Sequence, residues 1–99
     1  MRAERIDEKG EKYTAPSVAY PSIQLLANTW SRECVKEMAG RLAEDCIEQN
    51  VDILLAPGVN IKRHPLNGRN FEYFSEDPYL AGTLAEEYIR GLQENGVGA

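Results

Sequence analysis

The sequence has few of the features that identify several large classes of protein. Its 99 residues contain two cysteines, too few for a disulfide-stapled secreted domain. Sixteen acidic residues against eleven basic ones give a net charge of -5, which argues against a nucleic-acid binder. No uncharged stretch is apolar enough for a signal peptide or a transmembrane helix. We therefore expect at most one small domain, with no nucleic acid and no membrane as partner.

Common catalytic motifs are also missing. The chain has no GxGxxG, GxxxxGK[ST], HExxH, CxxC or GxSxG pattern. Its single histidine, His64, argues against a metal site. The composition thus excludes classes without naming a function.

The first part of the chain shows little regular pattern. Residues 1–21, which alternate in charge and then carry Pro16 and Pro21, are expected to be an irregular lead-in. Residues 22–27 (SIQLLA) form a short apolar run that we interpret as a buried strand.

Two segments have the apolar period of a helix. The spacing from Val35 to Ile47 predicts a helix over 32–49, with Ser31 as N-cap. A second helix is expected to start after Asp77, with Pro78 in its first turn, and to stop at Asn95 and Gly96. Cys34 and Cys46 would then lie roughly 18 Å apart on one helix, too far to form a disulfide.

Extended segments accompany the helices. Residues 51–56 (VDILLA) read as a buried parallel strand, and residues 97–99 look like the opening of another. The order strand, helix, strand, helix, strand predicts βαβ units and a parallel sheet. Because two strands and two helices leave sheet edges and helix faces bare, we expect a piece of something larger.

Residues 57–77 form a long loop at the carboxyl end of the second strand, where α/β folds gather their ligands. An arginine fork and asparagine amides there suit a polyhydroxylated ligand or an anion. The loop is rich in such groups: Asn60, Lys62, Arg63, His64, Asn67, Arg69, Asn70 and Glu72.

Each of these residues also has a structural interpretation. Lys62 and Arg63 are more easily explained as solvated loop charges than as ligand contacts. From spacing alone, Arg69 and Glu72 fit a structural ion pair as well as a substrate contact. Glu76 and Asp77 lie where a helix N-terminus favours acidic side chains, so a catalytic carboxylate pair is disfavoured. Trp30 and Tyr73 are expected to pack rather than to stack on a sugar.

One long string makes the sequence recognisable. The segment APGVNIKRHPLNGRNFEYFSEDP, with its surroundings from about residue 13 onward, strongly resembles the N-terminal barrel domain of glycoside hydrolase family 3 β-glucosidases. The resemblance implies an α/β fold: a fragment of a (β/α)8 TIM-type barrel, roughly two βα units with a truncated following strand. Residues 22–99 would form this partial barrel segment.

The resemblance also assigns roles. Arg69 matches the family arginine that hydrogen-bonds hydroxyls of the terminal non-reducing glucose, Glu72 would orient it, and Asn70 would support the same site from behind. The family is retaining and needs no metal or organic cofactor. Its sugar-binding aspartate would precede Arg2, and its Lys-His pair, nucleophile and acid/base would follow Ala99. We therefore expect no catalytic residue here and no activity from the isolated 99 residues.

Two alternatives to a β-glucosidase segment stay open. In the first, the chain acts alone as a non-catalytic module that completes its sheet by forming an oligomer. Alternatively, the parent enzyme acts on β-xylosides or arabinosides. Free thiols weakly favour a cytoplasmic location, although a secreted parent would also fit.

Overall fold

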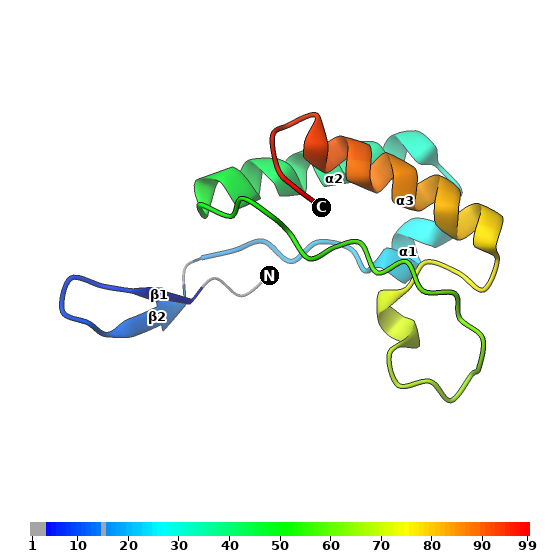
Figure 1. Cartoon of the computed structure of the whole chain (residues 1–99), viewed down its shortest axis with the longest axis horizontal. Coiled ribbons are helices and arrows are strands. Elements are labelled where there is room, and N and C mark those ends of the chain that lie inside the picture. Colours follow the sequence, from blue (N-terminus) through cyan, green and yellow to red (C-terminus); the bar gives the residue numbers. More distant parts are fainter. Residues whose placement is uncertain (1–3, 15) are drawn as a thin grey trace.

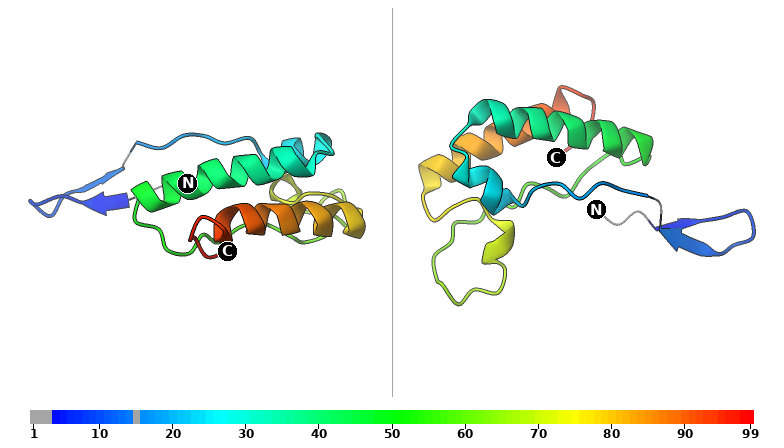
Figure 2. Two further views of the ribbon diagram at one scale, coloured as in Figure 1. Left: turned by 90° about the horizontal axis from the view of Figure 1, so that it is seen from above. Right: turned by 180° about the vertical axis from the view of Figure 1, so that it is seen from behind.

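Two long helices that run in the same direction form most of the core. The computed structural model describes residues 4–14 and 16–99. Helix α2 (Arg32–Glu48) and helix α3 (Pro78–Gln93) lie side by side and both run away from the α1 end of the molecule (Figures 1 and 2). Parallel helices are what successive βα units require, because each helix leads back after its own strand.

Both helices begin at the caps that the sequence predicts. The Ser31 side chain accepts a hydrogen bond from the Cys34 backbone N–H, and Asp77 accepts one from Tyr79. The predicted apolar faces are the buried ones, with the exception of Ile47, which is exposed. Helix α2 ends one residue earlier than expected, and Cys34 and Cys46 are both free thiols, as their spacing requires.

The strand expected over residues 22–27 is wrong, because this segment is a helix. Helix α1 (Ile23–Asn28) starts at Ser22, whose hydroxyl accepts a hydrogen bond from the Leu25 N–H at 3.1 Å. Leu26 and Ala27 are both buried, although they are consecutive. Neighbouring residues of a strand point to opposite faces, whereas a helix can turn both toward one core. The N-cap serine was the signal for the helix.

The irregular lead-in expected over residues 1–21 is corrected over residues 4–14, which form a hairpin. Strand β1 (Glu4–Ile6) pairs antiparallel with strand β2 (Lys12–Thr14), and the hairpin projects from the helices (Figure 1). Its turn is held by Asp7, whose carboxylate accepts from the N–H groups of Lys9 and Glu11, while Gly10 has a φ of +80°. Residues 16–21 carry no helix or strand, and Arg2 lies outside the described residues.

The predicted parallel strand over residues 51–56 is present only as a single bridge. Ile53 pairs in parallel with Gly98 through two backbone hydrogen bonds, Leu54 N–H to Gly98 C=O at 2.9 Å and Gly98 N–H to Asp52 C=O at 2.8 Å. The direction of pairing is as expected. Within the described residues no second bridge extends this pairing, and Leu55 is 98% exposed.

Small residues let α2 and α3 approach closely. A Cβ on Gly91 would lie 2.6 Å from the Ala39 Cβ and 2.7 Å from the Lys36 carbonyl oxygen. Such distances are far inside van der Waals contact, so only glycine fits there. Around this contact Val35, Leu84 and Leu92 are almost completely buried.

One ion pair joins the two helices at the edge of this core. Arg32 donates to Oε1 of Glu87 from Nη2 at 2.8 Å and from Nε at 3.2 Å. The Glu87 side chain is only 9% exposed. The hydrogen bond from Arg32 holds the pKa of Glu87 below its usual range, against the opposing effect of burial.

This pair makes stability depend on acidity. Because the folded-state pKa of Glu87 lies below the unfolded value of about 4.3, its contribution is fully present above that pH and is lost as the pH falls through the folded pKa. We expect Glu87→Gln to lower the free energy of unfolding at pH 7, and the difference from wild type to shrink well below about pH 4. Denaturant unfolding of the two proteins at pH 7 and at a pH well below about 4 measures this difference in free energy.

The matched control is Glu86→Gln, which removes an exposed carboxylate paired with Arg90 on the same helix. Exposed pairs contribute little, so this variant should stay close to wild type at both pH values. A Glu87→Gln difference that is the same in acid and at neutral pH would contradict the linkage.

Candidate functional site

The loop over residues 57–77 leaves the end of the extended segment and returns to the start of α3 (Figure 1). Its second half contains a short 3-10 helix, η1 (Asn70–Glu72), which packs against α1. Phe74 is buried and meets Tyr88 of α3 edge to face, with ring centroids 6.3 Å apart. The Lys62 N–H donates to the Ser75 carbonyl at 3.2 Å. The first arm of the loop, which contains Lys62, is thus bonded to the second arm, which contains Phe74 and Ser75. The second arm packs against the core through Phe74.

A glycine permits the first arm of the loop to pass close to η1. A Cβ on Gly58 would lie 2.5 Å from the Glu72 carbonyl oxygen and 3.0 Å from Cδ1 of Tyr73. The sequence alone assigns no role to Gly58. The PG pair directly after an apolar strand was the available signal.

The structure brings Arg69 and Glu72 together. Nε of Arg69 donates a hydrogen bond to Oε1 of Glu72. This hydrogen bond, with the charge of the carboxylate, raises the pKa of Arg69 further above its already high value, so the guanidinium is always charged. The arginine side chain is 73% exposed. No other partner engages this guanidinium within residues 4–14 and 16–99, so its terminal nitrogens remain available to a ligand.

The Asn70 side chain stabilises the loop through a hydrogen bond to the loop backbone. Its amide nitrogen donates to the His64 carbonyl oxygen at 2.8 Å. Its Oδ1 atom is buried and has no hydrogen-bond partner among the described residues. A buried acceptor without a donor is costly, so a group from outside these residues, or water, is expected to complete it.

The other candidate residues, two aromatic and one acidic, differ in their surroundings. Tyr73 is buried, as expected for a packing role, whereas Trp30 is 75% exposed, contrary to its expected packing. Trp30 also has a positive φ of 52°, at the turn between α1 and α2. Asp77 caps α3, in line with the structural interpretation of the acidic residues there.

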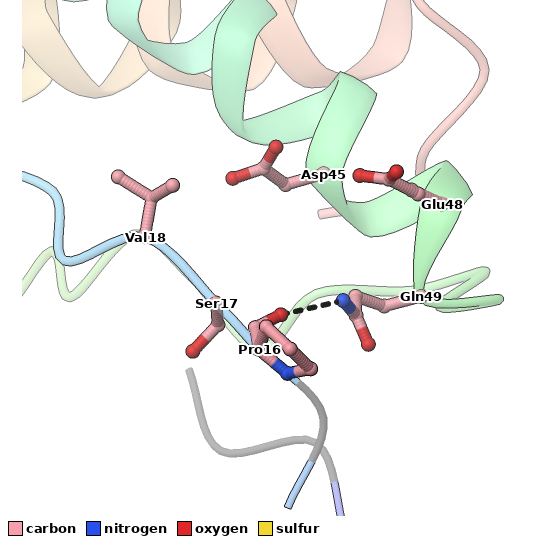
Figure 3. A pocket seen from close by; sticks show the side chains of 6 residues that line it. All are labelled: Pro16, Ser17, Val18, Asp45, Glu48 and Gln49. Carbon is pink, nitrogen blue, oxygen red and sulfur yellow. Dashed lines mark hydrogen bonds between the residues drawn. The ribbon is translucent and has the colours of Figure 1, made fainter.

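A separate hollow of about 200 Å³ lies at the C-terminal end of α2 (Figure 3). Gln49 closes one side by donating to the Pro16 carbonyl oxygen at 3.0 Å. Nearby, the Tyr20 hydroxyl donates to Oδ2 of Asp45 at 2.5 Å, and burial together with this carboxylate raises the pKa of Tyr20 to about 12. The hollow is lined by Pro16, Ser17, Val18, Asp45, Glu48 and Gln49.

Two further kinds of feature are absent from the described residues. No set of three His, Cys, Asp or Glu side chains in that part of the chain is arranged to hold a metal ion. Nor does a helix within it combine the length and the apolar character needed to cross a bilayer.

Two parallel helices, one parallel bridge between Ile53 and Gly98 and a polar loop that leads into α3 are features that βα units share. Residues 7–99 match the glycosyl hydrolase family 3 N-terminal domain. The chain belongs to this family, whose N-terminal domain is a TIM barrel.

The chain is similar to several glycosidases. Thermostable β-glucosidase B of Acetivibrio thermocellus is 55% identical over 86 residues, which are 87% of this chain and 11% of that protein. An exo-α-(1->6)-L-arabinopyranosidase of Bifidobacterium longum is 46% identical over 85 residues, 86% of this chain and 11% of that protein. The chain spans about a tenth of the length of the curated relatives it matches.

The chain is also similar to parts of solved β-glucosidase structures. The chain superposes on β-glucosidase 3B of Thermotoga neapolitana, solved in complex with glycerol, with a TM-score of 0.85 and 44% identity. The match covers 96% of this chain and 13% of that one. A β-glucosidase of Bifidobacterium adolescentis gives a TM-score of 0.81 and 47% identity, covering 84% and 12%.

The close approach at Gly58 predicts that the loop depends on this glycine. Gly58→Ala should force the η1 backbone aside and lower the free energy of unfolding by about 1–3 kcal/mol. Gly68→Ala is the matched control, because a Cβ at Gly68 meets nothing within 4 Å. It should change stability by less than about 0.5 kcal/mol. Thermal unfolding of both variants checks this, and equal effects would refute the steric account.

Proposed function

We propose that this chain is the part of a retaining β-glucosidase that supplies Arg69 to bind the terminal non-reducing β-D-glucosyl residue. The observation that carries the proposal is the exposed Arg69 guanidinium, held through Nε by Glu72 on a strand-to-helix loop. Family membership makes a glycoside the substrate class. The proposed ligand is thus a sugar with adjacent hydroxyl groups.

The geometry suits that task. With Nε engaged by Glu72, both terminal nitrogens of Arg69 keep their N–H donors, which form a planar fork. A fork of this kind can donate to two neighbouring hydroxyl oxygens at once. Because Glu72 holds the guanidinium before the sugar arrives, less side-chain entropy is lost on binding. Glu72 is therefore a positioning residue, and Asn70 positions the backbone behind it.

The chemical steps belong to other parts of the proposed enzyme. In a retaining mechanism, a carboxylate attacks the anomeric carbon while an acid protonates the leaving oxygen, and water then hydrolyses the glycosyl-enzyme. Arg69 takes no part in proton transfer, because its guanidinium stays charged throughout. Its contribution is to fix the sugar relative to those groups.

A second sugar is a candidate for the substrate. The arabinopyranosidase among the relatives favours a five-carbon substrate as the alternative. Hydrolysis of 4-nitrophenyl β-D-glucoside, β-D-xyloside and α-L-arabinopyranoside by the whole protein separates these choices. The proposal requires the highest kcat/KM for the glucoside.

Replacing Arg69 tests its assigned role. Arg69→Ala in the whole protein should lower kcat/KM for the aryl glucoside roughly 100-fold, because charged hydrogen bonds to the bound sugar are lost. Glu72→Gln should cost less, since the fork remains but is less firmly held. Initial-rate kinetics measure both.

The matched control is Arg90→Ala, which removes another exposed arginine paired with a nearby glutamate. This variant should keep the wild-type kcat/KM. An Arg69→Ala variant as active as Arg90→Ala would remove Arg69 from the sugar site.

The 99-residue chain by itself should hydrolyse no aryl β-glucoside, since none of its residues is assigned as nucleophile or acid/base. The assay compares purified chain with buffer over several hours. A rate that follows the protein through successive purification steps, and is lost on unfolding, would show that the chain carries its own catalytic groups.

A further inference from the structure

A hollow of about 240 Å³ lies in the same loop as Arg69, between its first arm and the approach to α3. It is separate from the Arg69–Glu72 pair, although Asn70 of η1 contributes to its wall. Its lining is formed by Lys62, Arg63, His64, Pro65, Asn70 and Glu76.

The hollow is positively charged in a negatively charged protein. Lys62 and Arg63 contribute two cations and Glu76 one carboxylate, whereas the whole chain has a net charge of -5. Neither cation forms an ion pair within the part of the chain that the structure describes. Lys62 is half-buried and Arg63 is exposed. Such a site favours an anion.

His64 adds a third donor. Its Nδ1 atom accepts a hydrogen bond from the Leu66 N–H at 3.1 Å. In the neutral ring the proton must then sit on Nε2, which makes that nitrogen a donor. The amide nitrogen of Asn70 is already engaged by the His64 carbonyl oxygen. The polar groups that remain are three donors, on Lys62, Arg63 and His64, and two acceptors, Asn70 Oδ1 and the Glu76 carboxylate. The three donors match the acceptor oxygens of a carboxylate or phosphate.

The wall of the hollow is held in place. The His64 carbonyl oxygen accepts both from Asn70 and from the Asn67 N–H, the latter at 3.1 Å. The Lys62 N–H is bonded to the Ser75 carbonyl on the other arm of the loop. The backbone that carries the donors is therefore fixed to η1, whose first residue directly follows Arg69.

We propose that this hollow binds an anionic group, carboxylate or phosphate, on the part of the substrate beyond the terminal sugar. The inference rests on the proposed function, because it takes Arg69 as the contact to that sugar. The hollow would make the enzyme prefer glycosides with acidic leaving groups. A free anion from solution has the same chemistry and is distinguished by the test.

The test compares two aryl β-glucosides, 4-nitrophenyl and 3-carboxy-4-nitrophenyl, which differ by one carboxylate. The whole protein should hydrolyse the carboxylated substrate with about tenfold higher kcat/KM. The double variant Lys62→Gln/Arg63→Gln should lose this preference, so that its kcat/KM is the same for both substrates. The control Lys9→Gln/Arg41→Gln removes the same charge at exposed positions elsewhere and should keep the preference.

Equal rates on both substrates in the wild-type protein, or a preference that survives in the double variant, would overturn the proposal. Calorimetric titration with inorganic phosphate tests whether the hollow binds a free anion instead. Phosphate binding that depends on Lys62 and Arg63, without any substrate preference, would assign the hollow to a free ion and overturn its assignment to the leaving group.

The two proposals can fail separately. If the protein hydrolyses no glucoside, the proposed function fails. Titration with 3-carboxy-4-nitrophenol, the acidic leaving group alone, still measures the hollow without hydrolysis. Binding lost in the double variant and kept in the control would support the hollow, and undetectable binding to wild type would refute it.

Discussion

The close contact between α2 and α3 at Gly91 is the constraint on which the rest of the structure depends. With no side chain at Gly91, α3 lies directly against Ala39, and the large apolar residues around this point are excluded from water. The position of α3 in turn sets that of Tyr88, against which Phe74 packs. Through Phe74 the end of the loop is fixed to the core, and so is everything that the loop carries.

In α/β folds the regular elements form a rigid scaffold, and the loops carry the functional residues. The loop has little regular structure, yet its two arms are joined by backbone hydrogen bonds and by the near approach of Gly58 to Glu72. Arg69 is therefore presented from a held backbone and is held again by its partner carboxylate. The same framework shapes the cationic hollow beside it, so the two proposed contacts, to the terminal sugar and to the group beyond it, come from one loop.

The features predicted well from the sequence are those whose causes are local. Apolar periodicity and capping residues define α2 and α3, because a helix closes its hydrogen bonds within a few residues. The i to i+3 spacing of Arg69 and Glu72 likewise places them within reach of each other. The errors in α1 and in the hairpin came from local signals that were overlooked, the Ser22 cap and the Asp7 turn with Gly10.

Other features could not be predicted, since they depend on residues distant in the sequence. The reduction of the predicted strand to a single bridge between Ile53 and Gly98 and the meeting of Lys62 with Glu76 at one hollow both require the folded chain. Read one by one, Lys62 and Arg63 are ordinary solvated charges. Only their convergence on a common space gives them a chemical meaning.

The central claim is that Arg69, held by Glu72, binds the terminal sugar. A crystal structure of the whole protein with glucose bound tests it most directly. The account predicts that the terminal nitrogens of Arg69 donate to two adjacent glucose hydroxyls while Nε stays bonded to Glu72. A bound glucose that Arg69 does not touch would contradict it.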